Sequence, residues 1–203
     1  MRNYTPIFIA TRVIIYSLFI YALAEAIRFD ALYPMEDGYF GEISRTEFSQ
    51  EFILLVLVAF YLLLGKRYPP VQPVSNLVAL FLLIGLIREL NFIISWWFWP
   101  ALLVLMAAIW LVWRDFTKLK SATQEFFAQP ASSWFFAGFL ITYIFSRLMG
   151  RSKFWLLMYD ESNYRMAKAA TEEGMELMGY GLMLISAVEF GLVFWNRKIK
   201  KVQ

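Results

Sequence analysis

The chain of 203 residues contains no cysteine and no histidine. Without cysteine it can form no disulfide, bind no metal through a thiolate and use no cysteine nucleophile. Without histidine it lacks the commonest general base, and a Ser–His dyad is excluded. The sequence also has no P-loop and no glycine-rich dinucleotide motif. We therefore expect no cofactor, no metal and no catalytic residue of these classes.

Charge is scarce as well. Only 17% of the residues are charged, whereas 60% are hydrophobic and 19% aromatic, and the mean hydropathy is +0.55. A soluble domain has roughly 45–50% apolar residues. Apolar runs approach or exceed the roughly 17–25 residues that a helix needs to cross a bilayer, and most charges fall between these runs. The composition predicts an integral membrane protein.

We expect one all-α domain, residues 1–203, built as a bundle of six transmembrane helices. Ser44 and Glu47 have capping-box spacing before the second helix, and a cluster of prolines follows it. The segment 152–171 mixes aromatic and charged residues, which is typical of an interfacial helix. The expected helices are residues 6–27, 47–65, 74–91, 98–113, 133–149 and 173–195.

Loop charges predict the orientation. Basic residues occur in the 66–67 turn, in the 114–120 stretch and in the tail 197–201, whereas the loop 30–47 has one arginine and five acids, a net charge of −4. The positive-inside rule then places both termini in the cytoplasm. In a bacterium the acidic loop would face the periplasm. In a membrane protein a net charge of +3 bears on orientation before it suggests nucleic-acid binding, so we expect no nucleic-acid partner.

All four aspartates lie outside the apolar segments, which excludes an intramembrane aspartyl pair; they are Asp30, Asp37, Asp115 and Asp160. Other charged residues fall near the outer ends of the expected helices, and there we expect the acidic residues of the last helix to meet arginines from the first, third and fifth. Glu173, Glu176 and Tyr180 share one helical face by their spacing. The candidate residues for a ligand or ion pathway are Glu25, Arg28, Arg88, Glu89, Arg147, Glu173, Glu176 and Tyr180.

A deeper pair is expected on the cytoplasmic side. Arg12 lies about six residues into the first helix and Glu189 about seven residues before the end of the last. Because they match in depth and are opposite in charge, we predict a structural ion pair that joins the first helix to the last.

Two interpretations of the outer charges stay open. They form a structural ion-pair network, or they mark the path of a substrate or ion. A water-accessible cavity that reaches Glu176 favours the path, and a dry, fully paired cluster favours the network. The first hypothesis is a transporter or channel-like protein for a small solute or ion. The alternatives are a non-catalytic accessory or scaffold subunit and, third, an intramembrane enzyme acting on a lipid. Expected partners are membrane lipids, with a second copy of the chain or another membrane subunit left open.

Three motifs carry a resemblance: "IREL" at 87–90, "SRLMG" at 146–150 and "EEGMELMGY" at 172–180. Together they resemble an uncharacterised family of small polytopic bacterial inner-membrane proteins. The resemblance spans the third to sixth expected helices. It implies multi-pass residence in a bacterial inner membrane and supplies no activity. The family has an acidic residue after "REL", where this chain has Asn91, so a role that needs that charge does not carry over.

Overall fold

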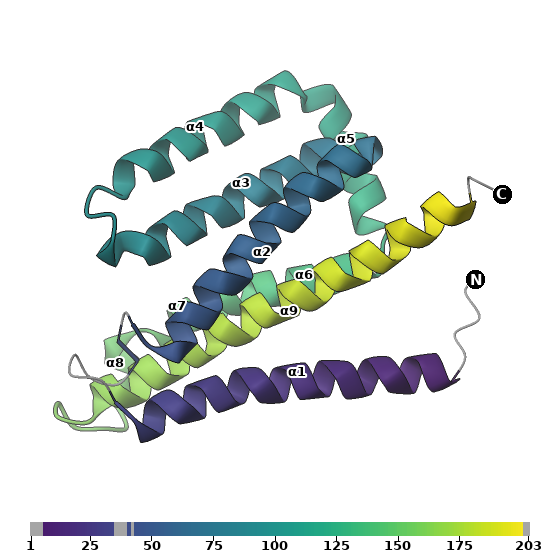
Figure 1. The fold of residues 1–203 in the computed structure, drawn as a ribbon. Helices are drawn as coiled ribbons and strands as arrows, with labels where there is room; N and C mark the ends of the chain where they lie inside the picture. Colours follow the sequence, from purple (N-terminus) through teal and green to yellow (C-terminus); the bar gives the residue numbers. More distant parts are fainter. Residues whose placement is uncertain (1–5, 35–39, 42, 201–203) are drawn as a thin grey trace.

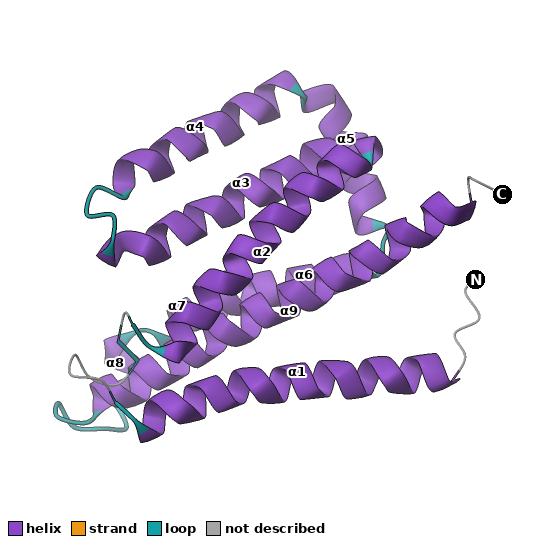
Figure 2. Ribbon diagram, viewed as in Figure 1, coloured by secondary structure: helices purple, strands orange, loops and turns teal. Residues whose placement is uncertain are grey.

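In the computed structural model the described residues are 6–34, 40, 41 and 43–200, with side chains described as far as Phe194. Helices take up most of these residues and none of them forms a strand (Figure 2). The prediction of an all-α fold is therefore confirmed. Residues 35–39 and Glu42 of the acidic loop, and Lys201 of the basic tail, lie outside the described residues.

The helices differ in length from 3 to 37 residues. In chain order they are α1 Pro6–Leu32, α2 Arg45–Arg67, η1 Pro69–Val71, α3 Gln72–Glu89, η2 Leu90–Phe92, α4 Phe98–Arg114, α5 Phe116–Phe127, α6 Ala131–Leu140, η3 Ile141–Phe145, α7 Ser146–Met149, α8 Ser152–Trp155 and α9 Tyr164–Lys200. The element η3 is a π-helix, whereas η1 and η2 are 3₁₀-helices.

Helix α2 begins as the sequence predicts. The hydroxyl of Ser44 accepts a hydrogen bond from the backbone N–H of Glu47 at 3.2 Å, which satisfies one of the free amides of the first turn. Asp30 adds a second cap, because its carboxylate accepts hydrogen bonds from the backbone N–H and the hydroxyl of Thr46 at 2.7 and 2.6 Å. The end of α1 is thereby fixed to the start of α2.

The long helices lie side by side along one general direction (Figure 1). Helices α6 and α9 pack along each other, α3 lies between α2 and α4, and α1 lies beside α9. The first residues of α1 and the last of α9 are at the same end of the bundle (Figure 1). The fully buried core side chains come mainly from α2, α3, α5 and α9; they include Leu54, Leu57, Tyr61, Leu82, Phe126, Leu177, Tyr180, Met183 and Phe190.

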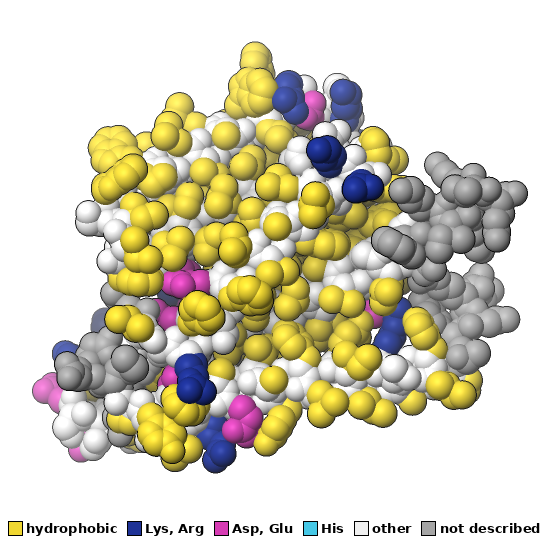
Figure 3. All heavy atoms as spheres, viewed as in Figure 1, with side chains coloured by type: hydrophobic (Ala, Val, Ile, Leu, Met, Phe, Trp, Pro, Cys, Tyr) yellow, Lys and Arg dark blue, Asp and Glu magenta, His cyan; other side chains and the backbone are white. Residues whose placement is uncertain are grey.

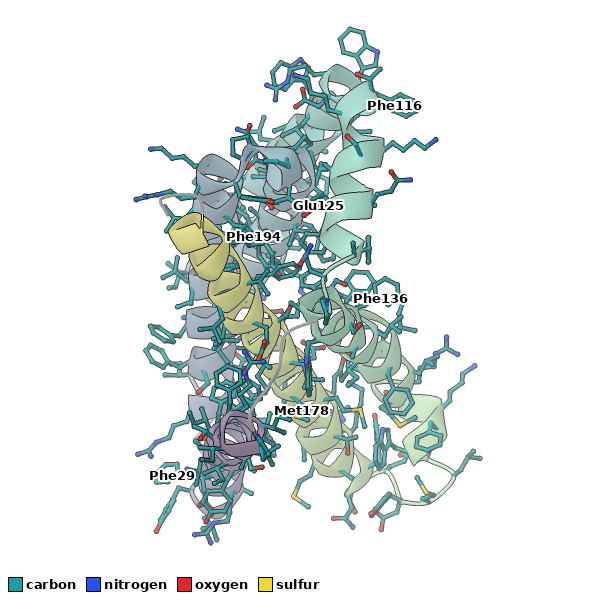
Figure 4. All side chains as sticks on the ribbon, turned by 90° about the vertical axis from the view of Figure 1, so that its right-hand side faces the viewer. Phe29, Phe116, Glu125, Phe136, Met178 and Phe194 are labelled. Atoms are coloured by element: carbon teal, nitrogen blue, oxygen red, sulfur yellow. The ribbon has the colours of Figure 1, made fainter. Side chains whose placement is uncertain are left out.

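The segment after α4 turns sharply. Helices α4 and α5 meet at 97°, so α5 lies across the end of the bundle. Figure 4 looks at this end, near Phe194, and shows α5 running from Phe116 towards α6, which carries Phe136. Ala122 and Phe126 of α5 are buried while its lysines are exposed, which is the pattern of a helix lying on a surface.

Several described helices are long and apolar enough to cross a membrane. Four qualify alone, and α4 with α5 would make a fifth if the bent pair is counted as one span; the four are Pro6–Leu32, Arg45–Arg67, Pro69–Phe92 and Tyr164–Phe194. Apolar side chains cover most of the face seen in Figure 3, and charged ones gather mostly where helices end. These helices indicate a membrane protein, and the six-span topology stays a prediction.

Three expected boundaries are wrong by five residues or more. Helix α1 continues past residue 27 to Leu32, and α9 runs from Tyr164 to Lys200, not from 173 to 195. At residues 27 and 173 the charges that seemed to end a helix have partners within the fold. As a result Asp30 belongs to α1 and is buried, at 5% exposure, although it does not pair with another aspartate. Only the short α8 and a turn remain of the expected interfacial segment before α9.

The turn before α9 is held by Asp160. Its carboxylate accepts hydrogen bonds from the hydroxyl of Ser162 at 2.8 Å and from the backbone N–H of Asn163 at 3.0 Å. The Ser162 hydrogen bond is the main reason that the pKa of Asp160 lies below its usual value. Asp160 therefore stays ionised while it orders the first residues before the helix.

Candidate functional site

Glu176 is the most enclosed carboxylate among the described residues, with 2% of its surface exposed. Its Oε1 lies 2.5 Å from Nη2 of Arg147 and 3.3 Å from the hydroxyl of Ser146, which donates to it. Its Oε2 lies 3.6 Å from Nη2 of Arg88. Helices α3, α7 and α9 thus converge on one carboxylate, and each of its oxygens faces a cation.

The pairing extends on both sides of Glu176. Arg88 also bonds Glu89 at 2.6 Å, and Arg147 also bonds Glu172 at 3.0 Å. Lys168 in turn lies 3.0 Å from Glu172. The result is one continuous ion-pair chain of three cations and three carboxylates, Glu89–Arg88–Glu176–Arg147–Glu172–Lys168, whose charges balance.

Backbone packing brings α9 close enough to make these contacts. A Cβ added to Gly179 of α9 would collide with the hydroxyl of Thr142 and with the carbonyl oxygen of Gly138. Thr142 lies in the π-helix η3 and donates a weak 3.5 Å hydrogen bond to the backbone carbonyl of Glu176. Glycine at 179 therefore permits a close approach that a larger residue would prevent.

Glu173 points to a different partner. Its carboxylate accepts a 3.0 Å hydrogen bond from the side-chain amide of Gln50 on α2, and the same amide donates to its backbone carbonyl at 3.2 Å. No cation lies within ion-pair distance of Glu173 among the described residues. On α2, the Oε1 atom of Glu51, the residue after Gln50, is buried without a hydrogen bond to another described residue. Glu173 is therefore adjacent to the ion-pair chain but outside it.

One turn after Glu176 on α9, the core contains buried hydroxyl groups. Tyr180 is fully buried, and its ring lies edge-on to Tyr143 with centroids 6.3 Å apart. The hydroxyls of Tyr61, Ser75, Tyr143 and Tyr180 are buried and reach no hydrogen-bond geometry with another described residue. Tyr143 lies near Tyr180, and Tyr61 lies near Ser186. Such groups are costly in an apolar interior unless ordered water satisfies them.

Glu25 and Arg28 stand apart from this cluster. They pair with each other at 2.8 Å along the exposed side of α1. No ion pair or hydrogen bond found among the described side chains joins either of them to Glu176. The structure therefore brings together Arg88, Glu89, Arg147 and Glu176 of the predicted pathway residues, with Glu173 and Tyr180 beside them, and leaves this pair elsewhere.

The deeper pair lies between α1 and α9. Nη1 of Arg12 is 2.8 Å from Oε2 of Glu189, with 20% and 12% of their side chains exposed. The hydroxyl of Tyr16 donates to the other oxygen of Glu189, and the guanidinium of Arg12 lies 4.3 Å from the centre of the Phe8 ring. These contacts join the first long helix to the last, as the depth match of the two residues in the sequence predicts.

Four participants were not predicted from the sequence: Gln50, Ser146, Lys168 and Glu172. One signal for them was present, because Lys168, Glu172 and Glu176 follow an i, i+4, i+8 spacing. That pattern is visible only if the last helix begins before residue 168. Gln50 and Ser146 gave no signal, since short polar side chains near helix ends are common.

Among the described residues no group of three or more aspartate or glutamate side chains is placed to hold a metal ion. Comparisons with known protein families, with curated proteins and with solved structures found no match to this chain.

Proposed function

We propose that the protein is a non-catalytic accessory or scaffold subunit of a membrane complex, and that its outer ion-pair chain fixes the packing of α3, α7 and α9. The observation that carries this proposal is the enclosure of Glu176, which is 2% exposed and faces a guanidinium on each side. A buried, doubly paired carboxylate suits a fixed register between helices, because separating it from either arginine removes one of the two positive charges that offset its burial.

We extend the proposal to topology: six spans in a bacterial inner membrane, with both termini in the cytoplasm. Support comes from the continuous helical run 131–149 formed by α6, η3 and α7, and from α4; counted as spans, these two apolar segments would bring the four that qualify by themselves to six. The common end of α1 and α9 in Figure 1 agrees with an even number of crossings. The resemblance of the three sequence motifs supports the inner membrane.

A partner subunit has an apolar surface to contact. Helix α4 packs against α3 and α5, and its other side exposes large side chains such as Trp99, Leu103 and Ile109, at 61–67%. This surface faces either lipid or another protein. A photo-crosslinking amino acid at Leu103 distinguishes the two in intact cells, and Ile14 on α1 is a matched position at 58% exposure. A discrete protein adduct from residue 103 supports the proposal, whereas no adduct from either site contradicts it.

A second candidate is a transporter or channel-like protein for protons or small cations. The buried hydroxyls of Tyr61, Tyr143 and Tyr180 favour it, because a row of waters between them would give a proton a path through the core. The neighbouring π-helix η3 agrees, since such turns are frequent at functional sites.

Reconstituted vesicles separate the two functions. The scaffold proposal predicts that purified protein adds no proton or potassium flux to liposomes that contain a pH-sensitive dye. Flux that depends on the protein and is lost in Tyr180→Phe would favour the transporter, because that change removes only the hydroxyl. Trp113→Phe, at an exposed position, is the matched control.

A further inference from the structure

A groove opens between the end of α1 and the start of α2. Its volume is about 690 Å³, and its lining includes Glu25, Arg28, Phe29, Arg45 and Phe48. It lies at the same end of the bundle as the ion-pair chain but is lined by none of that chain's residues. In Figure 3 charged and apolar side chains alternate in the lower-left region, where α1 ends.

The positive and negative charges that line the groove do not cancel. Arg28 is neutralised by Glu25 at 2.8 Å. Arg45 makes no ion pair with another described residue, and its guanidinium stacks 3.3 Å from the centre of the Phe29 ring. Two arginines against one glutamate leave the lining with one surplus positive charge, on a planar group that suits bidentate contact with phosphate oxygens.

The depth and shape of the groove fit a lipid. Arg45 is the first residue of α2, and Arg28 lies one turn before the end of α1, so both guanidiniums are at the level where a span ends and headgroups begin. Ala22 and Ala26 share one face of α1 and continue the groove towards the middle of the helix. Their small side chains extend the apolar part of the lining along α1 beside Phe48, where an acyl chain would lie.

We propose that this groove binds one phospholipid with a single net negative charge, its phosphate on Arg45 and Arg28 and an acyl chain along Ala22 and Ala26. The ring of Phe29 holds the Arg45 guanidinium in position, so little side-chain entropy is lost on binding. The carboxylate of Glu25 repels a second anion, so the groove holds only one phosphate. The proposal is independent of the accessory function.

Native mass spectrometry of the full-length protein in detergent, titrated with phosphatidylglycerol, tests the site. We expect one tightly retained lipid per protein, and weaker retention of zwitterionic phosphatidylcholine. Arg45→Gln should reduce retention about tenfold, because it removes a charge-assisted contact with phosphate. Arg151→Gln removes an exposed arginine at the same end of the bundle and should change nothing.

A charge-preserving variant tests the acyl-chain part of the groove separately from the phosphate contacts. Ala22→Phe keeps every charge and places its ring in the acyl channel, so it should also reduce phosphatidylglycerol retention. The site is refuted if Arg45→Gln and Ala22→Phe both retain lipid like the wild type. It is equally refuted if Arg151→Gln loses as much lipid as Arg45→Gln, or if phosphatidylcholine is retained as tightly as phosphatidylglycerol.

Discussion

Replacing Arg12 with leucine should destabilise the protein by about 3 kcal/mol. Breaking one side of a buried ion pair costs roughly 3–5 kcal/mol, and the lower end applies because 20% of the Arg12 side chain and 12% of the Glu189 side chain are exposed. The hydroxyl of Tyr16 still donates to Glu189, which also limits the loss.

Glu189→Leu should cost a similar amount for a different reason. The guanidinium of Arg12 loses its carboxylate partner Glu189 and can only move towards the first residues of α1. The double variant, with leucine at both positions, strands no charge and should lose less than the sum of the single variants by about 2 kcal/mol.

The assay is equilibrium unfolding in mixed detergent micelles, with the two single variants and the double variant measured together. Arg114→Leu is the control, since Arg114 pairs with Asp115 at 2.6 Å but is 48% exposed, and such pairs contribute about 0–1 kcal/mol. Strict additivity of the Arg12 and Glu189 losses would refute the reasoning, because two side chains that form a pair must show a coupling energy.

Two further predictions follow from packing and topology. Gly179→Ala should lose about 1–3 kcal/mol of unfolding free energy, because its Cβ would collide with Thr142, whereas Gly174→Ala meets only Ile27 at 3.5 Å and should be close to neutral in the same assay. Single cysteines in this cysteine-free chain should react with an impermeant maleimide from opposite sides: Met158→Cys from the periplasm and Lys118→Cys only after the cells are opened; labelling of both from one side would contradict the proposed topology.

The helices were predictable because their signals are local. Apolar runs of sufficient length, the cap at Ser44 and the prolines at 69 and 70 each act within a few residues of the boundary they set. The start of α9 was not predictable in this way. Its first turns carry Lys168 and Glu172, whose charges are matched by each other and by Arg147 from a distant segment.

The site was predictable in part for the same reason. Depth along antiparallel helices is enough to place Arg88, Arg147 and Glu176 near one another. It does not fix how each helix is rotated about its axis, so it could not reveal that Glu25 and Arg28 point away from the cluster or that Glu173 faces Gln50. Rotation depends on the close approach of α6 and α9 at Gly138 and Gly179, which no single segment encodes.

The most direct test of the central claim is the stability of Glu176→Gln, measured beside Glu173→Gln. Glutamine keeps the shape of Glu176 and its hydrogen bond to Ser146 but removes the charge that both arginines share, so Arg88 keeps only Glu89 and Arg147 keeps only Glu172. We predict a loss of about 2 kcal/mol for Glu176→Gln, less than for a stranded buried charge, because Arg88 and Arg147 are 37% and 42% exposed and each keeps another carboxylate. We predict less than about 1 kcal/mol for Glu173→Gln, which leaves no cation without a partner. A Glu176→Gln protein with wild-type stability would contradict the account.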